Sequence, residues 1–574
     1  MKGLALLGLV PSALALNIPT QQILFPEKAT SHNEAIEAVE PASRETCPQA
    51  PKVAAPYDGF HSSLTFLKDE AFRARQAQRL SRAVQVPTTV GDYATDPYDE
   101  SFEPVVQFQK LLEQMFPLVH KHAELEHINR LGLVFTFKGA DTTRKPVLFM
   151  AHQDVVPIAD PSDWTYPPFE GHFDGEWIWG RGSSDCKNVL IGLMSSLEDL
   201  LSQNWRPQRT VVLAFGFDEE SHGFLGAGSI APVLEERYGK DSFEFILDEG
   251  GMGLQSLGED SDIVYALPGV GEKGSLDLIL DLAVPGGHSS IPPAHTGVGI
   301  MSEIIYELER QDLFSPWLDN SHPSHGMLEC QVRYSPEHVE SWLADKLTEG
   351  DAASLAEAVA ESRGPAVRYT LQTSQAADLF HGGVKTNALP EKISAVMNYR
   401  VALHMTPDQL RERAVRIIRP IAERHNITMH IAFPGEADVR DDSAEDRTLT
   451  LSPLSVPLKP APISPTDPLS SKTWARFAGV ARSVFESHPN PLAKSKSESS
   501  PTVVVTGDIM TGNTDTRFYW SLSENIYRWS PSRAGGTFNI HTVDERIHLD
   551  VHLEAMMLYY DLIRSFDGWD ESSE

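Results

Sequence analysis

Short apolar runs end abruptly at ionisable residues in the first half of the chain. Three of them, residues 147–151, 211–217 and 243–247, are rich in valine, leucine and phenylalanine. Continuous apolar runs of this length predict strands that are buried on both faces of a parallel sheet. Residues 187–203, between the first two, have apolar side chains at helical spacing, namely Leu190, Ile191, Met194, Leu197, Leu200 and Leu201. The order strand, helix, strand predicts an α/β domain.

A second alternating region follows. Residues 275–284, 392–401 and 427–433 have the pattern of strands, and residues 298–310 and 406–424 have the pattern of helices. This alternation predicts a small inserted α/β domain. We expect the first domain to resume after it, near residue 469.

Imidazole and carboxylate groups gather just after the predicted strands and near the C-terminus. They are His152, Asp154, Asp185, Glu219, Glu220, Asp248, Glu249 and His541. Functional groups in open α/β sheets lie beyond the carboxyl ends of the strands. A ligand set of imidazole and carboxylate without thiolate suits two zinc ions that are held for hydrolysis.

Each of these groups also has a structural explanation. A single histidine is more often a surface or hydrogen-bonded residue than a ligand, and Asp185 could simply cap the helix that begins at Lys187. The acidic triplet 218–220 could be a solvated turn. The recurrence of such groups at several strand ends favours the metal centre.

Several motifs together carry a specific resemblance. The chain has, in order, HQD, GSSDCK, DEE, DEGG, GHSS, NALP and a late IH. This order resembles the M20 family of metallopeptidases and aminoacylases, and most of all its carboxypeptidase S and N-acyl-amino-acid hydrolase branch. The resemblance runs from about residue 147 to residue 541. It implies a zinc-peptidase-type catalytic domain, whose mixed sheet is flanked by helices, and an inserted ferredoxin-like lid and dimerisation domain.

The resemblance implies two zinc ions per subunit. His152 would bind one ion and Asp185 would bridge both. Glu220 and His541 would hold the second ion. Asp248 would complete the first, with its neighbour Glu249 as the alternative.

The resemblance also implies catalytic and substrate-binding residues. Asp154 would orient a histidine ligand, a task that suits a carboxylate, and Glu219 would be the general base. His288, supplied by the partner subunit, would donate a hydrogen bond to the developing oxyanion. Asn387 and Arg400 would hold the free carboxylate of the substrate. Without the resemblance, a surface role is about equally plausible for the lid histidine and the arginine.

Length and charge set outer bounds. With 574 residues, the chain exceeds what a single hydrophobic core usually supports. Its net charge of −32 speaks against nucleic acid or an anionic membrane as partner. We expect a signal peptide (1–15), an N-terminal extension (16–95), a catalytic domain (96–272 and 469–574), a lid (273–450) and a linker (451–468).

The N-terminus has the pattern of a secretory signal peptide. Lys2 precedes an apolar run, and Ala13-Leu14-Ala15 has the small-x-small cleavage pattern. A short uncleaved anchor is the alternative. Together with the glycosylation sequon at Asn426, this predicts the vacuole lumen or the cell exterior.

The chain has three cysteines, Cys47, Cys186 and Cys330. Three cysteines do not predict a disulfide framework. We interpret Cys186, beside Asp185, as a packing residue.

The function expected from these features is a dizinc exopeptidase that removes the C-terminal residue of short peptides such as Gly-X, as a homodimer through the lid. The alternative is an N-acyl-amino-acid hydrolase or synthase. A non-catalytic member of the fold ranks last, because both Glu219 and Asp185 are present.

Overall fold

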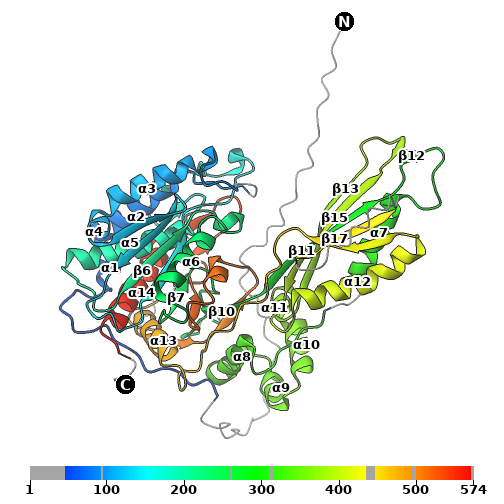
Figure 1. Ribbon diagram of the computed structural model, residues 1–574. Coiled ribbons are helices and arrows are strands. Elements are labelled where there is room, and N and C mark those ends of the chain that lie inside the picture. Colours follow the sequence, from blue (N-terminus) through cyan, green and yellow to red (C-terminus); the bar gives the residue numbers. More distant parts are fainter. Residues whose placement is uncertain are drawn as a thin grey trace.

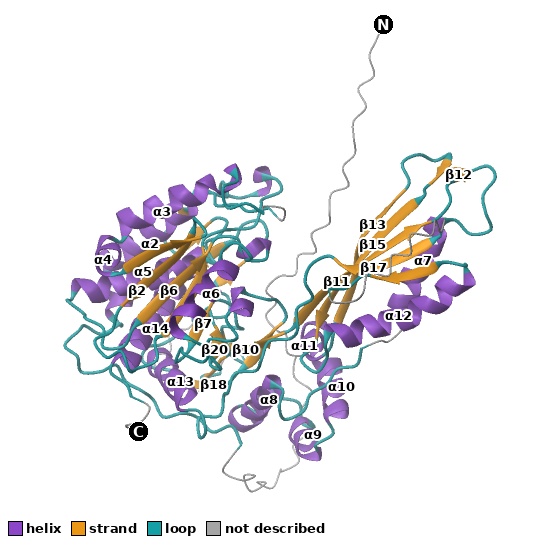
Figure 2. Ribbon diagram, viewed as in Figure 1, coloured by secondary structure: helices purple, strands orange, loops and turns teal. Residues whose placement is uncertain are grey.

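The computed structural model describes residues 46–91, 95–258, 261–310, 314–434, 447–493 and 500–570. Within them, the chain forms a large α/β domain and a smaller domain that projects from it (Figures 1 and 2). The expected signal peptide lies outside the described residues. None of the described helices is long and apolar enough to cross a membrane.

An eight-stranded mixed sheet forms the centre of the large domain. Its strands, in spatial order, are β1 (Glu124–Ile128), β2 (Gly132–Phe137), β6 (Val211–Gly216), β3 (Val147–His152), β7 (Ile246–Asp248), β20 (Ile526–Arg528), β10 (Gly269–Glu272) and β19 (Asp508–Met510). The three predicted buried strands form β3, β6 and β7, which lie side by side and run parallel. Every residue of these three strands is buried. The predicted α/β fold is therefore confirmed.

Helices cover both faces of this sheet. Because successive strand residues point to opposite faces, Phe149 packs in one apolar cluster while Leu148 and Met150 pack in another. The first face is covered by α2 (Glu70–Val84), α5 (Lys187–Ser202), α13 (Lys472–Phe485) and α14 (Leu549–Asp567), and the second by α6 (Ala227–Tyr238). Three further helices complete this domain, α1 (Thr65–Lys68), α3 (Glu103–Met115) and α4 (Pro117–His122).

Helix α5, predicted from its apolar spacing, is buried almost all round. It packs against β3 on one side and against α2, α4 and α14 on the others. Helix α2 belongs to the expected N-terminal extension, yet its residues Phe72 and Leu80 are part of the main core. The side chain of Asp69 caps α2 by accepting hydrogen bonds from the backbone of Ala71 and Phe72.

The smaller domain is a five-stranded sheet with two helices. Its strands, in spatial order, are β13 (Ser374–Gly382), β15 (Lys392–Val401), β11 (Gly274–Ala283), β17 (Thr448–Pro453) and β16 (Thr428–Ile431). Helices α7 (Gly297–Arg310) and α12 (Pro407–Arg424) pack on it and close a separate apolar core. This domain is the expected lid. Its last strand ends at Pro453, so the expected linker begins inside that strand.

The lid leaves the large domain through a short connection. Strand β10 of the central sheet ends at Glu272, and β11 of the lid begins at Gly274. Only Lys273 lies between them. The same residue is buried, and its Nζ donates hydrogen bonds to the carbonyl oxygens of Tyr369 and Gln372.

A helical insert follows α7 and ends at β13. It contains α8 (Pro323–Tyr334), α9 (Leu343–Glu349), α10 (Ala352–Arg363) and α11 (Pro365–Leu371). Cys330 of α8 forms a disulfide with Cys47, which the cysteine count did not predict. The bond joins the insert to the N-terminal segment of the described chain.

Three small sheets complete the fold of the described residues. They are β12 (Gly287–His288) with β14 (Ala388–Leu389); β18 (Thr502–Val505) with β9 (Ile263–Ala266) and β8 (Leu254–Gln255); and β21 (Thr537–Phe538) with β22 (Arg546–His548), β5 (Trp177–Trp179) and β4 (His172–Phe173). The first lies at the tip of the lid, far from the large domain (Figure 1). The last holds both ends of the loop that carries His541.

Candidate metal centre

The parallel strands bring the predicted ligands to one edge of the central sheet. His152 is the last residue of β3, and Glu249 directly follows β7. Glu219 and Glu220 stand in a short 3-10 helix just after β6. The loop before α5 adds Asp185, and the loop between β21 and β22 adds His541. Six predicted residues from five segments thus converge.

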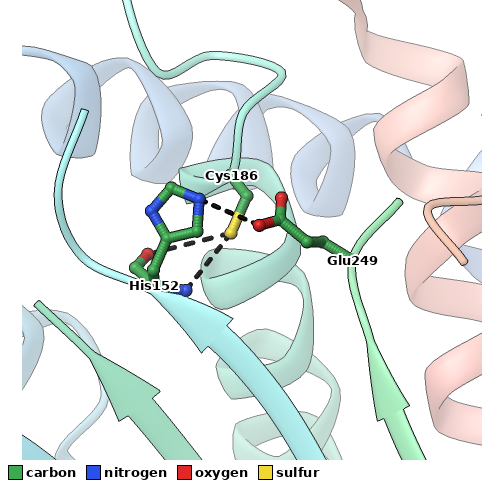
Figure 3. A group of neighbouring side chains, drawn as sticks. All are labelled: His152, Cys186 and Glu249. Carbon is green, nitrogen blue, oxygen red and sulfur yellow. Dashed lines mark hydrogen bonds and ion pairs between the residues drawn. The ribbon is translucent and has the colours of Figure 1, made fainter. Parts of the chain in front are cut away.

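His152 occupies the buried half of the site. Its Nε2 lies 3.0 Å from Oε1 of Glu249 and 3.2 Å from Oδ1 of Asp185. Figure 3 shows the imidazole and the Glu249 carboxylate facing each other. On the other side of the ring, Nδ1 lies 3.0 Å from the carbonyl oxygen of Asp154 and 3.3 Å from its Oδ1. These contacts suit the predicted role of Asp154 in orienting the ring.

His541 occupies the exposed half. Its Nε2 lies 3.1 Å from Oδ2 of Asp185 and 3.1 Å from Oε1 of Glu220. Its side chain is 49% exposed, whereas that of His152 is 2% exposed. The two oxygens of Asp185 thus contact two different histidines, one on each side.

Of the two neighbouring acids after β7, Glu249 reaches the site and Asp248 does not. Glu249 groups with His152, with ligand atoms within 4.8 Å, and Asp248 belongs to no such group among the described residues. Oδ2 of Asp248 is buried without a hydrogen-bond partner. The preference for Asp248 as ligand is therefore not supported by the geometry, which favours the alternative that the sequence left open.

Cys186 lies beside His152 and Glu249, with ligand atoms within 4.8 Å of one another (Figure 3). Its Sγ accepts a hydrogen bond from the backbone nitrogen of His152 at 3.3 Å. Burial raises the pKa of the Cys186 thiol well above its usual range. Since metals bind the thiolate, a buried thiol hydrogen-bonded to the backbone fits a packing role.

The cluster carries more negative charge than its histidines can balance. Burial raises the pKa of Glu219 well above its usual range and that of Glu249 to about 8, and neighbouring acids add to both shifts. Burial also opposes ionisation of Asp185, yet hydrogen bonds from His152 and His541 lower its pKa. Buried charges require counter-ions or metals. The excess of carboxylates and the imidazole donors fit divalent cations such as zinc.

The predicted substrate residues lie at opposite ends of the lid. Asn387 and His288 share the tip: Gly287 and His288 pair with the Ala388–Leu389 strand, and the backbone nitrogen of Ser289 donates to the carbonyl oxygen of Asn387 at 3.3 Å. Arg400 lies at the base of β15, where its Nη1 donates to Oδ1 of Asn513 at 3.0 Å. Strand β15 therefore separates Arg400 from the tip by roughly 25 Å, at about 3.3 Å per residue.

Sequence reasoning missed two residues that hold this site together. Asn513 joins Arg400 to the hinge, because its Nδ2 also donates to the carbonyl oxygen of Lys273. Glu545 is fully buried behind the loop that carries Asp185. The one sequence feature that could have pointed to Glu545 is its position four residues after the predicted ligand His541.

Comparison with known proteins identifies the family of the chain. The model of peptidase family M20/M25/M40 matches residues 148–565. Carboxypeptidase S from Saccharomyces cerevisiae is 37% identical over 519 residues, which cover 88% of this chain and 86% of the relative. The human N-fatty-acyl-amino acid synthase/hydrolase PM20D1 is 28% identical over 508 residues, which cover 88% and 89%.

A solved structure supports the fold. Human carnosine dipeptidase 1 superposes with a TM-score of 0.56 at 13% identity, covering 88% of this chain and 98% of that one. At this identity the likeness concerns the fold alone. The family match and the 37% identity with carboxypeptidase S carry the assignment. The chain is a metal-dependent hydrolase that belongs to peptidase family M20/M25/M40.

Proposed function

We propose that this hydrolase is a dizinc exopeptidase of the carboxypeptidase S type, which removes the C-terminal residue from short peptides such as Gly-X. The observation that carries the proposal is the carboxylate of Asp185, whose oxygens lie 3.2 Å from His152 and 3.1 Å from His541. Glu249 would complete one ion's ligands and Glu220 the other's.

The residues around the ions have separate tasks. The bound zinc ions would polarise the scissile carbonyl and activate a water molecule. Glu219 is half-buried, with its carboxylate within 4.8 Å of the ligand atoms of His152 and Glu220. This position suits a general base that takes a proton from the attacking water and delivers it to the departing nitrogen. Asp154 keeps the ring of His152 in one orientation.

The free carboxylate of the substrate fits Arg400. A guanidinium group binds a carboxylate in a fixed planar geometry. Asn513 holds Nη1 of Arg400 at 3.0 Å, which leaves the rest of the guanidinium for a ligand. Recognition of a terminal carboxylate would restrict cleavage to the end of a peptide, as in an exopeptidase rather than an endopeptidase.

A homodimer would complete the site. His288 and Asn387 stand at the lid tip, whereas Arg400 lies at the lid base, so one substrate cannot contact all three within one subunit. Strand β13 is an edge of the lid sheet, and its residues Leu379 and Phe380 are 48% and 42% exposed. An exposed apolar edge strand favours pairing with a second chain. The partner's lid tip would then supply the histidine.

An N-acyl-amino-acid hydrolase is the second candidate. Three exposed apolar side chains stand close in sequence to the metal site: Phe224, Met252 and Ile540, which are 50%, 40% and 40% exposed. Phe224 follows Glu220 by four residues, and Met252 follows Glu249 by three. Ile540 directly precedes His541. Apolar groups there would favour a substrate with a long acyl chain.

We place the enzyme in the secretory pathway, in the vacuole lumen or outside the cell. The sequon residue Asn426 is exposed, as glycosylation requires. The disulfide between Cys47 and Cys330 agrees with an oxidising compartment. The proposed location rests mainly on the predicted signal peptide. A short uncleaved membrane anchor is the alternative to cleavage.

One comparison separates the two candidate activities. Purified zinc-loaded protein is assayed against Gly-Leu, Gly-Leu amide and N-oleoyl-leucine. The proposal expects Gly-Leu to have the highest kcat/KM, and amidation to lower that value by roughly 100-fold, because each lost charged hydrogen bond costs about 1.5–3 kcal/mol. A higher kcat/KM for N-oleoyl-leucine would assign the chain to the acyl-amino-acid branch.

A further inference from the structure

Glu545 lies behind the metal centre and has no role in the proposed reaction. Its side chain is fully buried, and it follows His541 by four residues. Both residues belong to the segment that runs from β21 into β22.

The Glu545 carboxylate is bound almost entirely by one loop. Its Oε1 accepts hydrogen bonds from the backbone nitrogens of Gly182 and Ser184, each at 3.0 Å, and from Oγ of Ser184 at 3.1 Å. Its Oε2 accepts from Nη1 of Arg181 at 2.6 Å. The backbone adds a bond, since the nitrogen of Gly180 donates to the carbonyl oxygen of Glu545 at 2.8 Å.

The next residue of this loop is Asp185. Glu545 therefore joins the segment that carries His541 to the loop that carries the shared carboxylate. Nε2 of His541 and Oδ2 of Asp185 lie 3.1 Å apart. No contact of Glu545 reaches His152 or Glu249, which form the buried half of the site.

We infer that Glu545 is a positioning residue for the second metal ion, because it sets the place of Asp185 relative to His541. The inference rests on the proposed two-ion function. Side chains that hold metal ligands in place affect affinity by roughly 10- to 100-fold when they are replaced. Glu545 anchors both segments that meet at the exposed ion, those of Asp185 and His541. The buried ion shares only Asp185 with them and is also held by His152 and Glu249. The exposed ion therefore depends on Glu545 more strongly than the buried ion does.

A simpler explanation is a buried ion pair that only stabilises the fold. The two explanations differ in what Glu545→Gln changes. The amide would present an NH2 group either to Arg181 or to the backbone donors of the loop, so the loop would shift. A purely structural pair would lower the melting temperature and leave both zinc affinities unchanged.

The test is calorimetric titration of metal-free protein with Zn²⁺. For Glu545→Gln we expect one zinc site weakened roughly 10- to 100-fold and the other weakened clearly less, because Asp185 contributes one oxygen to each. We also expect kcat to recover when zinc is raised. Cobalt loading gives a second readout, in which the absorption band of one ion should change more than that of the other.

Glu554→Gln is the matched control. Glu554 is also fully buried and paired, with His488 at 2.6 Å and Arg533 at 2.7 Å, but it contacts no metal-ligand loop. We expect this variant to keep both zinc sites.

Equal zinc affinities in Glu545→Gln and wild type would overturn the inference. A loss of zinc affinity by the same factor at both sites would also overturn it. If Glu545→Gln does not fold, Ser184→Ala decides, since it removes one hydrogen bond from the same carboxylate. A weaker second site in that variant supports the inference, and two unchanged sites overturn it. A wild-type protein that binds fewer than two ions would instead refute the proposed function.

Discussion

Oε1 of Glu249 lies 3.0 Å from Nε2 of His152, whereas the carboxylate of the preceding residue, Asp248, takes no part in the cluster. The strand ends between these two acids, and neighbouring side chains of an extended chain point to opposite sides. Only one of them can therefore face the edge of the sheet where the other ligands gather.

This relationship predicts different metal content for two adjacent variants. Glu249→Ala should lose the ion on the His152 side, because a ligand is removed. Asp248→Ala should keep both ions, although removal of a buried carboxylate can change stability. Zinc content after dialysis checks this expectation. Loss of zinc from Asp248→Ala alone would restore the original preference for that residue.

Glu219→Gln should keep zinc and lose activity. The glutamine retains the size of the side chain but cannot accept a proton, so kcat should fall by roughly 100-fold or more. Metal analysis and a Gly-Leu assay on the same sample measure both properties. Glu236→Gln, at an exposed position of α6, is the control and should behave as wild type. Loss of zinc from Glu219→Gln would identify Glu219 as a ligand instead.

His288→Ala should lower kcat by roughly 100-fold without loss of zinc, because a hydrogen bond to the oxyanion is a large term in a water-excluded site. Nδ1 of His288 already accepts hydrogen bonds from Ser290, at 2.8 Å from its Oγ and 3.1 Å from its nitrogen. This leaves Nε2 for a substrate. His295→Ala changes another exposed lid histidine and should keep activity.

Mixing two inactive proteins tests whether the His288 contact crosses subunits. A mixed dimer of His288→Ala and Glu219→Gln chains contains one intact Glu219 facing one intact His288, so part of the activity should return. Wild-type activity of His288→Ala would remove the histidine from the mechanism. A large loss without recovery on mixing would place it in its own subunit's site.

Much of this organisation could be predicted from the sequence, because it depends on local patterns. The apolar runs of β3 and β6 and the helical spacing of α5 are local properties of the sequence. The predicted metal ligands come directly after these strands or before this helix in the sequence. The choice between Asp248 and Glu249 could not be made, since it depends on where one strand ends.

Other features depend on contacts between distant segments. Arg400 and Asn387 are thirteen residues apart in sequence, and only the register of the lid sheet places them at opposite ends. Cys47 pairs with Cys330 across 283 residues, a distance that no spacing rule covers. Glu545 gains its role from a loop more than 350 residues earlier.

His552 predicts a loss of stability in acid. Both ring nitrogens are buried without a hydrogen-bond partner, and burial lowers the pKa of His552 to about 4. Above pH 6.5 the ring is neutral in both states. As the pH falls toward 4, the unfolded chain takes up a proton that the folded chain does not. The free energy of unfolding should therefore fall by roughly 1.4 kcal/mol per pH unit from this residue.

Urea unfolding between pH 4.5 and 7 measures this slope. His552→Leu should flatten it, because the titrating group is removed. His127→Asn, at an exposed position of β1, should keep the wild-type slope. The same slope in His552→Leu and wild type would exclude His552 as the source of acid sensitivity.

The central claim is that one carboxylate, that of Asp185, is shared by two metal ions. The most direct measurement is the zinc content of Asp185→Ala beside that of His541→Ala. Because a bridging carboxylate neutralises two cations, Asp185→Ala should retain no tightly bound zinc, while His541→Ala should retain one ion on the His152 side. One tightly held zinc ion in Asp185→Ala would contradict the account.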